Sequence, residues 1–198
     1  MKLTKTKIKE LALISAGHSF RGKIKDIPGS GIRVLQLRDV SLESEIRWSD
    51  CQETKLVKPN SGNWLKNDDI LIVARGSHFF AKKISGIDNM KVVASPYFYI
   101  VRLINNEVTP SFLTWFINQT TAQDYFSSKA NGTKSKNIRR EVVEQLQIPI
   151  PNMSTQNSIC ALDQKFKNEK ELLMKKIKKN QTLLSEIADN LVYETAKH

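Results

Sequence analysis

The stretch from Ser154 to Lys197 contains neither glycine nor proline, and this feature limits most strongly how the chain can fold. Strong helix formers fill the stretch, and Ser154 is the predicted N-cap. The sequence therefore predicts one helix of about 60 Å, at ~1.5 Å per residue. A helix of that length cannot bury its apolar side against a small domain alone, so it needs a partner. The alternative is a helical hairpin on the same chain, for which the stretch offers no loop residue.

Apolar residues recur along the second half of this predicted helix at heptad spacing. The earlier apolar positions Ile159, Leu162 and Phe166 also fit a heptad, but in a different phase, which is the mark of a stutter. The pattern predicts a coiled-coil seam for dimerisation. Its members are Leu173, Ile177, Asn180, Leu184, Ile187 and Leu191.

The first hundred residues are typical of β structure. Alternating or continuous apolar runs predict strands at 32–40, 70–74 and 97–104, with shorter candidates within 46–50, 78–84 and 90–95. Thr109 and Pro110 then open a helix that could run through Tyr125 and Phe126. A short helical turn and a strand ending at Pro149 and Pro151 follow. The predicted class is α+β: a mixed-sheet domain followed by a long C-terminal helix.

The chain is basic, with 31 Lys and Arg against 20 Asp and Glu and a formal net charge of +11. Residues 1–153 hold 23 basic and 14 acidic residues, so most of the excess belongs to the β-rich part. No apolar run approaches the ~18 residues of a membrane span. Cys51 and Cys160 stand far apart, which favours reduced thiols in the cytoplasm. Nucleic acid is therefore the first partner to consider.

One loop, residues 128–140, concentrates five basic residues without an acid and contains the turn signal Asn131–Gly132. Its amides and hydroxyls could reach base edges while its charges contact phosphates. The alternative is a solvated surface loop. A second basic group follows the buried strand at 70–74. The candidate DNA-binding residues are Arg75, Ser77, His78, Lys82, Lys83, Asn131, Gly132, Thr133, Lys134, Ser135, Lys136 and Arg139.

Signals for catalysis are sparse. Walker, GxGxxG and GxSxG motifs are absent, and the three histidines have no neighbouring metal ligands. The segment Glu53–Lys55 spells E-x-K, and with Asp39 or Asp50 it could bind Mg²⁺ and cut a phosphodiester. A magnesium-dependent nuclease therefore stays open as an alternative, as does a purely structural coiled-coil protein.

The order of these pieces resembles one half of the specificity subunit of type I restriction–modification systems. The similarity lies in residues 21–40, 65–76, 109–119 and 130–159. The last stretch is the most specific: Gly132–Thr133, a short helix, a strand ending in P-x-P, and Gln156 near the start of the long helix. The chain departs from the family at Thr155, where Glu is usual, and at 65–69, where Gly commonly precedes the Asp.

The resemblance implies a DNA-binding target recognition domain at 1–152 and a spacer and dimerisation helix at 153–198. A full-length member has two such units, whose helices pack antiparallel and set the distance between two half-sites. This chain would restore that geometry as a homodimer on double-stranded DNA with an interrupted palindrome. The resemblance also implies a non-catalytic subunit that docks a methyltransferase subunit and a restriction subunit. No cofactor is expected here: S-adenosylmethionine, Mg²⁺ and ATP would sit on those partners.

Overall fold

The computed structural model describes residues 5–56, 63–76, 78–132 and 136–195, and the chain divides into two compact units, residues 1–157 and 158–198. Within the described residues, no helix is both apolar and long enough to cross a bilayer. The strands are β1 Lys5–Lys7, β2 Ala12–Ala16, β3 Ile32–Leu35, β4 Gln52–Glu53, β5 Ile70–Val73, β6 Ala81–Lys83, β7 Lys91–Ala94, β8 Phe98–Leu103 and β9 Gln147–Pro149. The helices are α1 Ile8–Leu11, α2 Pro110–Ile117, α3 Thr120–Lys129, α4 Arg140–Gln145 and α5 Met153–Thr195, with 3-10 turns η1 Leu37–Asp39 and η2 Trp48–Asp50.

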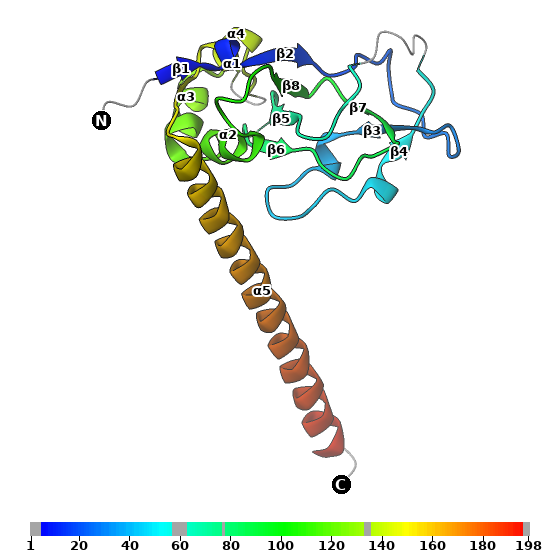
Figure 1. Ribbon diagram of the computed structural model, residues 1–198. Coiled ribbons are helices and arrows are strands. Elements are labelled where there is room, and N and C mark those ends of the chain that lie inside the picture. The colour runs from blue at the N-terminus through cyan, green and yellow to red at the C-terminus, as the bar shows by residue number, and fades with distance from the viewer. Residues whose placement is uncertain (1–4, 57–62, 77, 133–135, 196–198) are drawn as a thin grey trace. The chain divides into compact units, whose positions relative to one another are not determined.

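The strands of the first unit form three sheets (Figure 1). The largest is antiparallel with the order β2-β8-β5-β6, and β1 pairs with β9 in a two-stranded sheet. The third has the order β4-β3-β7, in which β3 and β7 run parallel. The predicted α+β class with mixed strand directions is confirmed, but the strands do not form the single sheet expected.

One hydrophobic cluster of the core joins the four-stranded and the three-stranded sheet. Leu71 and Val73 of β5 and Phe98 of β8 cluster with Leu35 of β3 and Val92 of β7. All four residues of β5 are buried, as the continuous apolar run predicted. Cys51 belongs to this cluster, and burial raises the pKa of its thiol to about 11. The cluster therefore ties the central strands of the two sheets together.

Two predicted strands end earlier or form elsewhere. The strand at 32–40 stops at Leu35, because the Asp39 carboxylate accepts a 2.8 Å hydrogen bond from the Gln36 amide and turns the chain into η1. The strand expected within 46–50 is a 3-10 turn, in which the Trp48 indole donates to the Ser85 carbonyl at 3.0 Å. The strand β4 follows at 52–53 instead.

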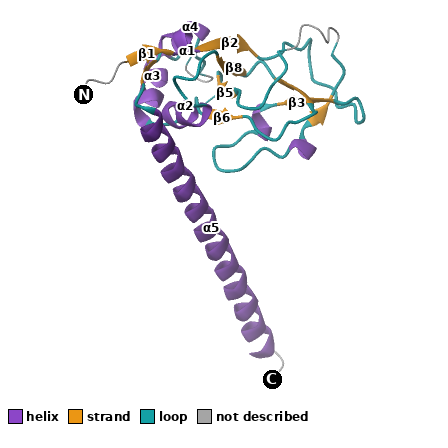
Figure 2. Ribbon diagram, viewed as in Figure 1, coloured by secondary structure: helices purple, strands orange, loops and turns teal. Residues whose placement is uncertain are grey.

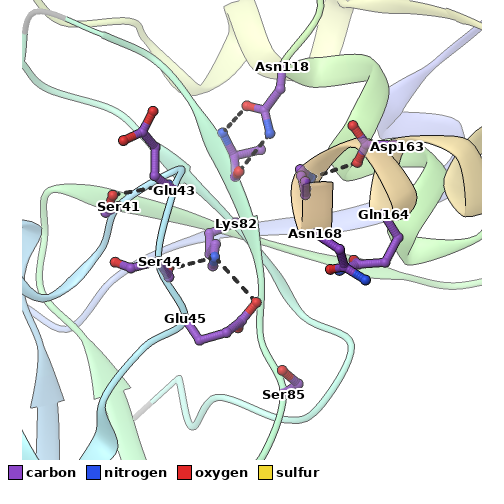
Figure 3. A network of polar contacts seen from close by, with 12 residues as sticks. Ser41, Glu43, Ser44, Glu45, Lys82, Ser85, Asn118, Asp163, Gln164 and Asn168 are labelled. Atoms are coloured by element: carbon purple, nitrogen blue, oxygen red, sulfur yellow. Dashed lines mark hydrogen bonds and ion pairs between the residues drawn. The ribbon is translucent and has the colours of Figure 1, made fainter. Parts of the chain in front are cut away.

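The predicted start of a helix at Thr109 is confirmed. The prediction that this helix continues through Tyr125 and Phe126 is wrong. The Thr109 hydroxyl accepts from the Phe112 amide at 3.2 Å, and Pro110 occupies the first helical position. The helix breaks at Asn118, whose side-chain amide bonds to both backbone groups of Ala81 on β6 at 2.8 and 2.9 Å (Figure 3). Two shorter helices, α2 and α3, replace the single one because this tertiary contact holds the corner between them.

The long helix is confirmed, and Figure 2 shows α5 as one uninterrupted helix. Its cap is Asn152 rather than Ser154: the Asn152 side chain accepts from the Thr155 amide at 2.8 Å. Gln156 is fully buried, and its side chain bonds to Glu107, Thr109 and Pro151 backbone atoms. The first turn of α5 is therefore part of the first unit.

Candidate nucleic-acid interface

Two of the predicted DNA-binding regions, far apart in the sequence, meet in the structure. Arg75 follows β5 and forms an antiparallel bridge with Asn137. On either side of that bridge, the Gly76 amide donates to the Lys136 carbonyl and the Ile138 amide donates to the Ala74 carbonyl, both at 3.0 Å. The end of β5 and the end of the basic loop therefore form one continuous surface.

The described ends of the basic loop are tightly held. Asn131 and Asn137 exchange two backbone hydrogen bonds of 2.9 Å, and Gly132 takes a φ of 98°, in the left-handed region that favours glycine. Ile138 is buried, and its carbonyl accepts from the Tyr99 hydroxyl at 3.2 Å. Burial raises the pKa of Tyr99 above its ordinary value.

The exposed side chains around this junction are those of Arg75, His78, Asn131, Lys136 and Arg139. Within the described part of the chain, neither Arg75 nor Lys136 makes an ion pair. Both cations are thus available to phosphates. Ser77, Thr133, Lys134 and Ser135 were also predicted to bind DNA, and they lie outside the described residues.

Lys82 and Lys83 are not brought to this junction. Lys83 pairs with Ile70 at the start of β5, whereas Arg75 follows the end of that strand. The Lys82 ammonium donates to the Ser44 carbonyl at 2.9 Å and lies 3.9 Å from Glu45 (Figure 3). Lys83 lies 3.6 Å from Asp68. A role of these two lysines in DNA binding stays a prediction, and each already has an acidic neighbour.

The acids of the nuclease alternative have structural contacts. Glu53 accepts from the Gly31 amide at 3.2 Å and lies 3.8 Å from Arg33. Asp39 accepts from the Gln36 amide, and Asp50 accepts from the Ser49 hydroxyl at 2.9 Å. Among the described residues, no three His, Cys, Asp or Glu side chains form a group able to hold a metal ion.

A family model described as "Type I restriction modification DNA specificity domain" matches residues 2–182. The chain belongs to this family. The resemblance predicted from the sequence is therefore confirmed. A search of curated proteins gives no match for this specificity domain.

Solved structures share the fold of the specificity domain. The S subunit of a type I system from M. genitalium matches with a TM-score of 0.60 and 19% identity, over 93% of this chain and 44% of that one. The HsdS subunit from Thermoanaerobacter tengcongensis matches with a TM-score of 0.56 and 14% identity, over 84% and 37%. A third solved chain comes from a study of complex assembly and conformational transition of the type I R-M system. It matches with a TM-score of 0.56 and 13% identity, over 86% of this chain and 39% of that one. This chain thus spans less than half the length of each.

The sequence analysis missed a residue beside the junction. Tyr97 was placed inside a strand, but it lies in the turn before β8, where its carbonyl accepts from the Ala74 amide at 2.7 Å. Its side chain is 48% exposed. The signal was present in the sequence, because Pro96 cannot donate a hydrogen bond to a sheet and favours a turn.

The predicted dimerisation seam is exposed on α5 of this specificity domain. Leu173, Ile177, Leu184, Ile187 and Leu191 are each about half exposed or more, and Asn180 is exposed among them. Ion pairs between residues four apart, such as Lys175 with Glu171 at 2.6 Å, lie along the same helix.

We expect the salt dependence of DNA binding to report the junction directly. Each cation that neutralises a phosphate contributes about one unit to the slope of log K against log salt. Replacing both Arg75 and Lys136 with alanine should therefore lower that slope by about two units for binding of the purified chain to duplex DNA. Fluorescence anisotropy between about 50 and 200 mM salt measures it.

Lys91→Ala is the matched control, because this exposed lysine lies at the start of β7 and away from the junction. Its slope should equal that of the unchanged protein. A Lys91→Ala effect as large as that of the double variant would mean that the cationic footprint is diffuse, and the junction would lose its special role.

Proposed function

We propose that this specificity domain recognises one half-site of double-stranded DNA within a type I restriction–modification complex. The observation that carries the proposal is the junction itself: the sequence-distant Arg75 and Lys136 segments are joined by backbone hydrogen bonds into one exposed cationic surface. Such a fixed surface can position a protein on phosphates while neighbouring side chains contact base edges. Membership of a DNA specificity family supports the same conclusion.

The second part of the proposal is that α5 pairs with α5 of a second copy. An isolated helix with an apolar heptad seam gains stability when the seam is buried against a partner. Two-fold pairing would place two identical domains on the DNA, so the recognised sequence would be an interrupted palindrome. The length of the paired helices would then set the spacer between the half-sites.

The third part concerns division of labour among subunits. The specificity domain acts without catalysis of its own, in the cytoplasm, and docks a methyltransferase subunit and a restriction subunit. S-adenosylmethionine, Mg²⁺ and ATP bind those subunits in this scheme.

The direct test is co-expression with a type I methyltransferase subunit, followed by purification of the complex and mapping of methylated adenines or cytosines on genomic DNA. The proposal requires co-purification and one recurring interrupted palindrome among the methylated sites. Methylation without any common sequence, or cleavage of DNA by the purified chain with Mg²⁺ alone, would contradict it.

Exchange of residues 1–152 for the corresponding part of another family member tests recognition of the half-site separately from the length of the spacer. We expect the exchanged protein to direct methylation to a different half-site while the spacer length stays the same, because α5 is unchanged. Mapping of methylated sites gives both quantities at once. A changed spacer would show that the helix does not set the distance, and the proposed architecture would be wrong.

A further inference from the structure

The turn that joins β7 to β8 presents an exposed aromatic ring. The Phe98 amide donates to the Ser95 carbonyl at 3.2 Å and closes a four-residue turn with Pro96 and Tyr97 at its corners. Pro96 restricts the backbone of the turn, and Tyr97 is 48% exposed at its second corner. A large ring held half in water by a stiff turn has no evident part in the core.

Three other chain segments bond to this turn and its immediate neighbours. After β2, the Gly17 amide donates to the Phe98 carbonyl at 3.0 Å and the His18 amide donates to the Ala94 carbonyl at 2.7 Å. At the end of β3, the Leu35 carbonyl accepts from the Ser95 amide at 2.8 Å. After β5, the Ala74 amide donates to the Tyr97 carbonyl at 2.7 Å. The turn is therefore the point where strand ends from both larger sheets meet.

The backbone at Gly17 lies directly against the turn. A Cβ atom added at Gly17 would lie 2.0 Å from the Ser95 carbonyl oxygen, which is too close for any side chain. Ser95 itself is 1% exposed. Groups that recognise a ligand act best when their neighbours hold them in place, and the backbone hydrogen bonds of the turn fix the position of the Tyr97 backbone.

The charge near the turn favours a nucleic acid as the ligand that Tyr97 contacts. Ala74, which bonds to Tyr97, is followed directly by Arg75 and is also bonded to Ile138 at the end of the basic loop. The segments 17–20, 74–78, 95–98 and 136–140 contain no acidic residue. The Tyr97 backbone is thus bonded directly to the segment that carries Arg75 of the cationic junction.

We infer that Tyr97 contacts a base edge of the half-site through its ring and so helps to determine the recognised sequence. The inference rests on the proposed function. A phenol ring carries no charge to attract phosphate, and its apolar face can pack on the thymine methyl group or another apolar part of a base pair. The Tyr97 hydroxyl can also donate to a phosphate, a contact that Tyr97→Phe removes while the ring stays. The cations of the junction set the position of the DNA, and Tyr97 supplies discrimination.

The test compares methylation maps of the assembled complex with and without the ring. With Tyr97→Ala, we expect the preference at one position, repeated in both half-sites of the palindrome, to fall by about 5- to 100-fold, while other positions keep theirs. Tyr97→Phe keeps the ring and should keep the preference. Leu13→Ala is the control, since Leu13 is 66% exposed and pairs with Arg102, away from the start of β8.

Each outcome of this test either supports or overturns the inference about Tyr97. Thermal unfolding and co-purification with the methyltransferase subunit are measured for every variant, and both should match the unchanged protein. An unchanged recognition sequence for Tyr97→Ala overturns the inference, and so does an even loss at all sites with weaker co-purification, which would assign Tyr97 to the methyltransferase interface. Equal losses for Tyr97→Phe and Tyr97→Ala overturn contact through the ring. If the unchanged complex itself methylates no common sequence, the proposed function fails, and this inference fails with it.

Discussion

Replacing Ile177 and Leu184 together with aspartate is expected to turn a dimer of this specificity domain into a monomer. The two residues are 52% and 68% exposed on α5 and lie two helical turns apart on the predicted seam. In a symmetric pair of helices the change would bury four carboxylates in an apolar interface, at a cost on the order of several kcal/mol. Analytical ultracentrifugation at tens of micromolar measures the mass directly.

The control for this change is Thr182→Asp with Ser185→Asp. It adds the same two charges to α5 on the side away from the seam, where each hydroxyl donates to a carbonyl of the preceding turn. This variant should remain dimeric, and in both variants the thermal transition of residues 1–157 should be unchanged. An unchanged protein that is already monomeric would contradict pairing through α5.

Sequence reasoning succeeded where the determining contacts are local. Thr109 and Pro110 start a helix through their own backbone and side-chain chemistry, and residues 70–73 are apolar on both sides because both faces of β5 are covered. The absence of glycine and proline after Ser154 likewise predicted α5. In each case a few neighbouring residues contain the whole signal.

Sequence reasoning failed where a contact with a distant part of the chain determines the local structure. The helix break at Asn118 depends on Ala81, which lies 37 residues earlier. The strands β1 and β2 were not predicted, because β1 is Lys-Thr-Lys without an apolar residue, the short helix α1 separates it from β2, and their pairing partners, β9 and β8, come much later. Such pairings have no signature in the local pattern.

The candidate site shows the same division. Arg75 and the basic loop were each recognised from composition, but nothing in the sequence indicates that Arg75 bridges Asn137. The grouping of Lys82 and Lys83 with Arg75 relied on closeness in sequence, and the antiparallel turn from β5 to β6 separates them in space. Tyr97 was missed because the run 97–104 is strongly β-prone and only Pro96 signals that the strand begins one residue later.

An ion pair with a buried carboxylate joins two strands at the other end of the four-stranded sheet. The Asp69 side chain is 2% exposed and accepts two hydrogen bonds from Arg102, at 2.7 and 2.6 Å. It also accepts from the Lys66 amide at 2.8 Å, while Arg102 donates to the Trp64 carbonyl at 2.9 Å. The hydrogen bond to Asp69 raises the pKa of Arg102, as expected for a stabilised cation. The pair thus links the start of β5 to β8.

Arg102→Leu is expected to lower the free energy of unfolding by about 2–3 kcal/mol, because it leaves the Asp69 charge buried without a partner. The figure is below the ~3–5 kcal/mol typical of fully buried pairs, since the Arg102 side chain is 39% exposed. Urea unfolding at neutral pH measures the loss as a lower midpoint at an unchanged slope.

Two comparisons separate this ion pair from ordinary surface charge. Asp69→Asn combined with Arg102→Leu should recover part of the lost stability, because no buried charge then remains. Lys83→Leu removes one partner of the more exposed Lys83–Asp68 pair and should change stability by about 0.5 kcal/mol or less. If Arg102→Leu costs no more than Lys83→Leu, the pair does not stabilise the sheet. Because the pair lies at the end of β5 opposite Arg75 and Tyr97, complexes of Arg102→Leu that remain folded should methylate the same sequence as the unchanged protein.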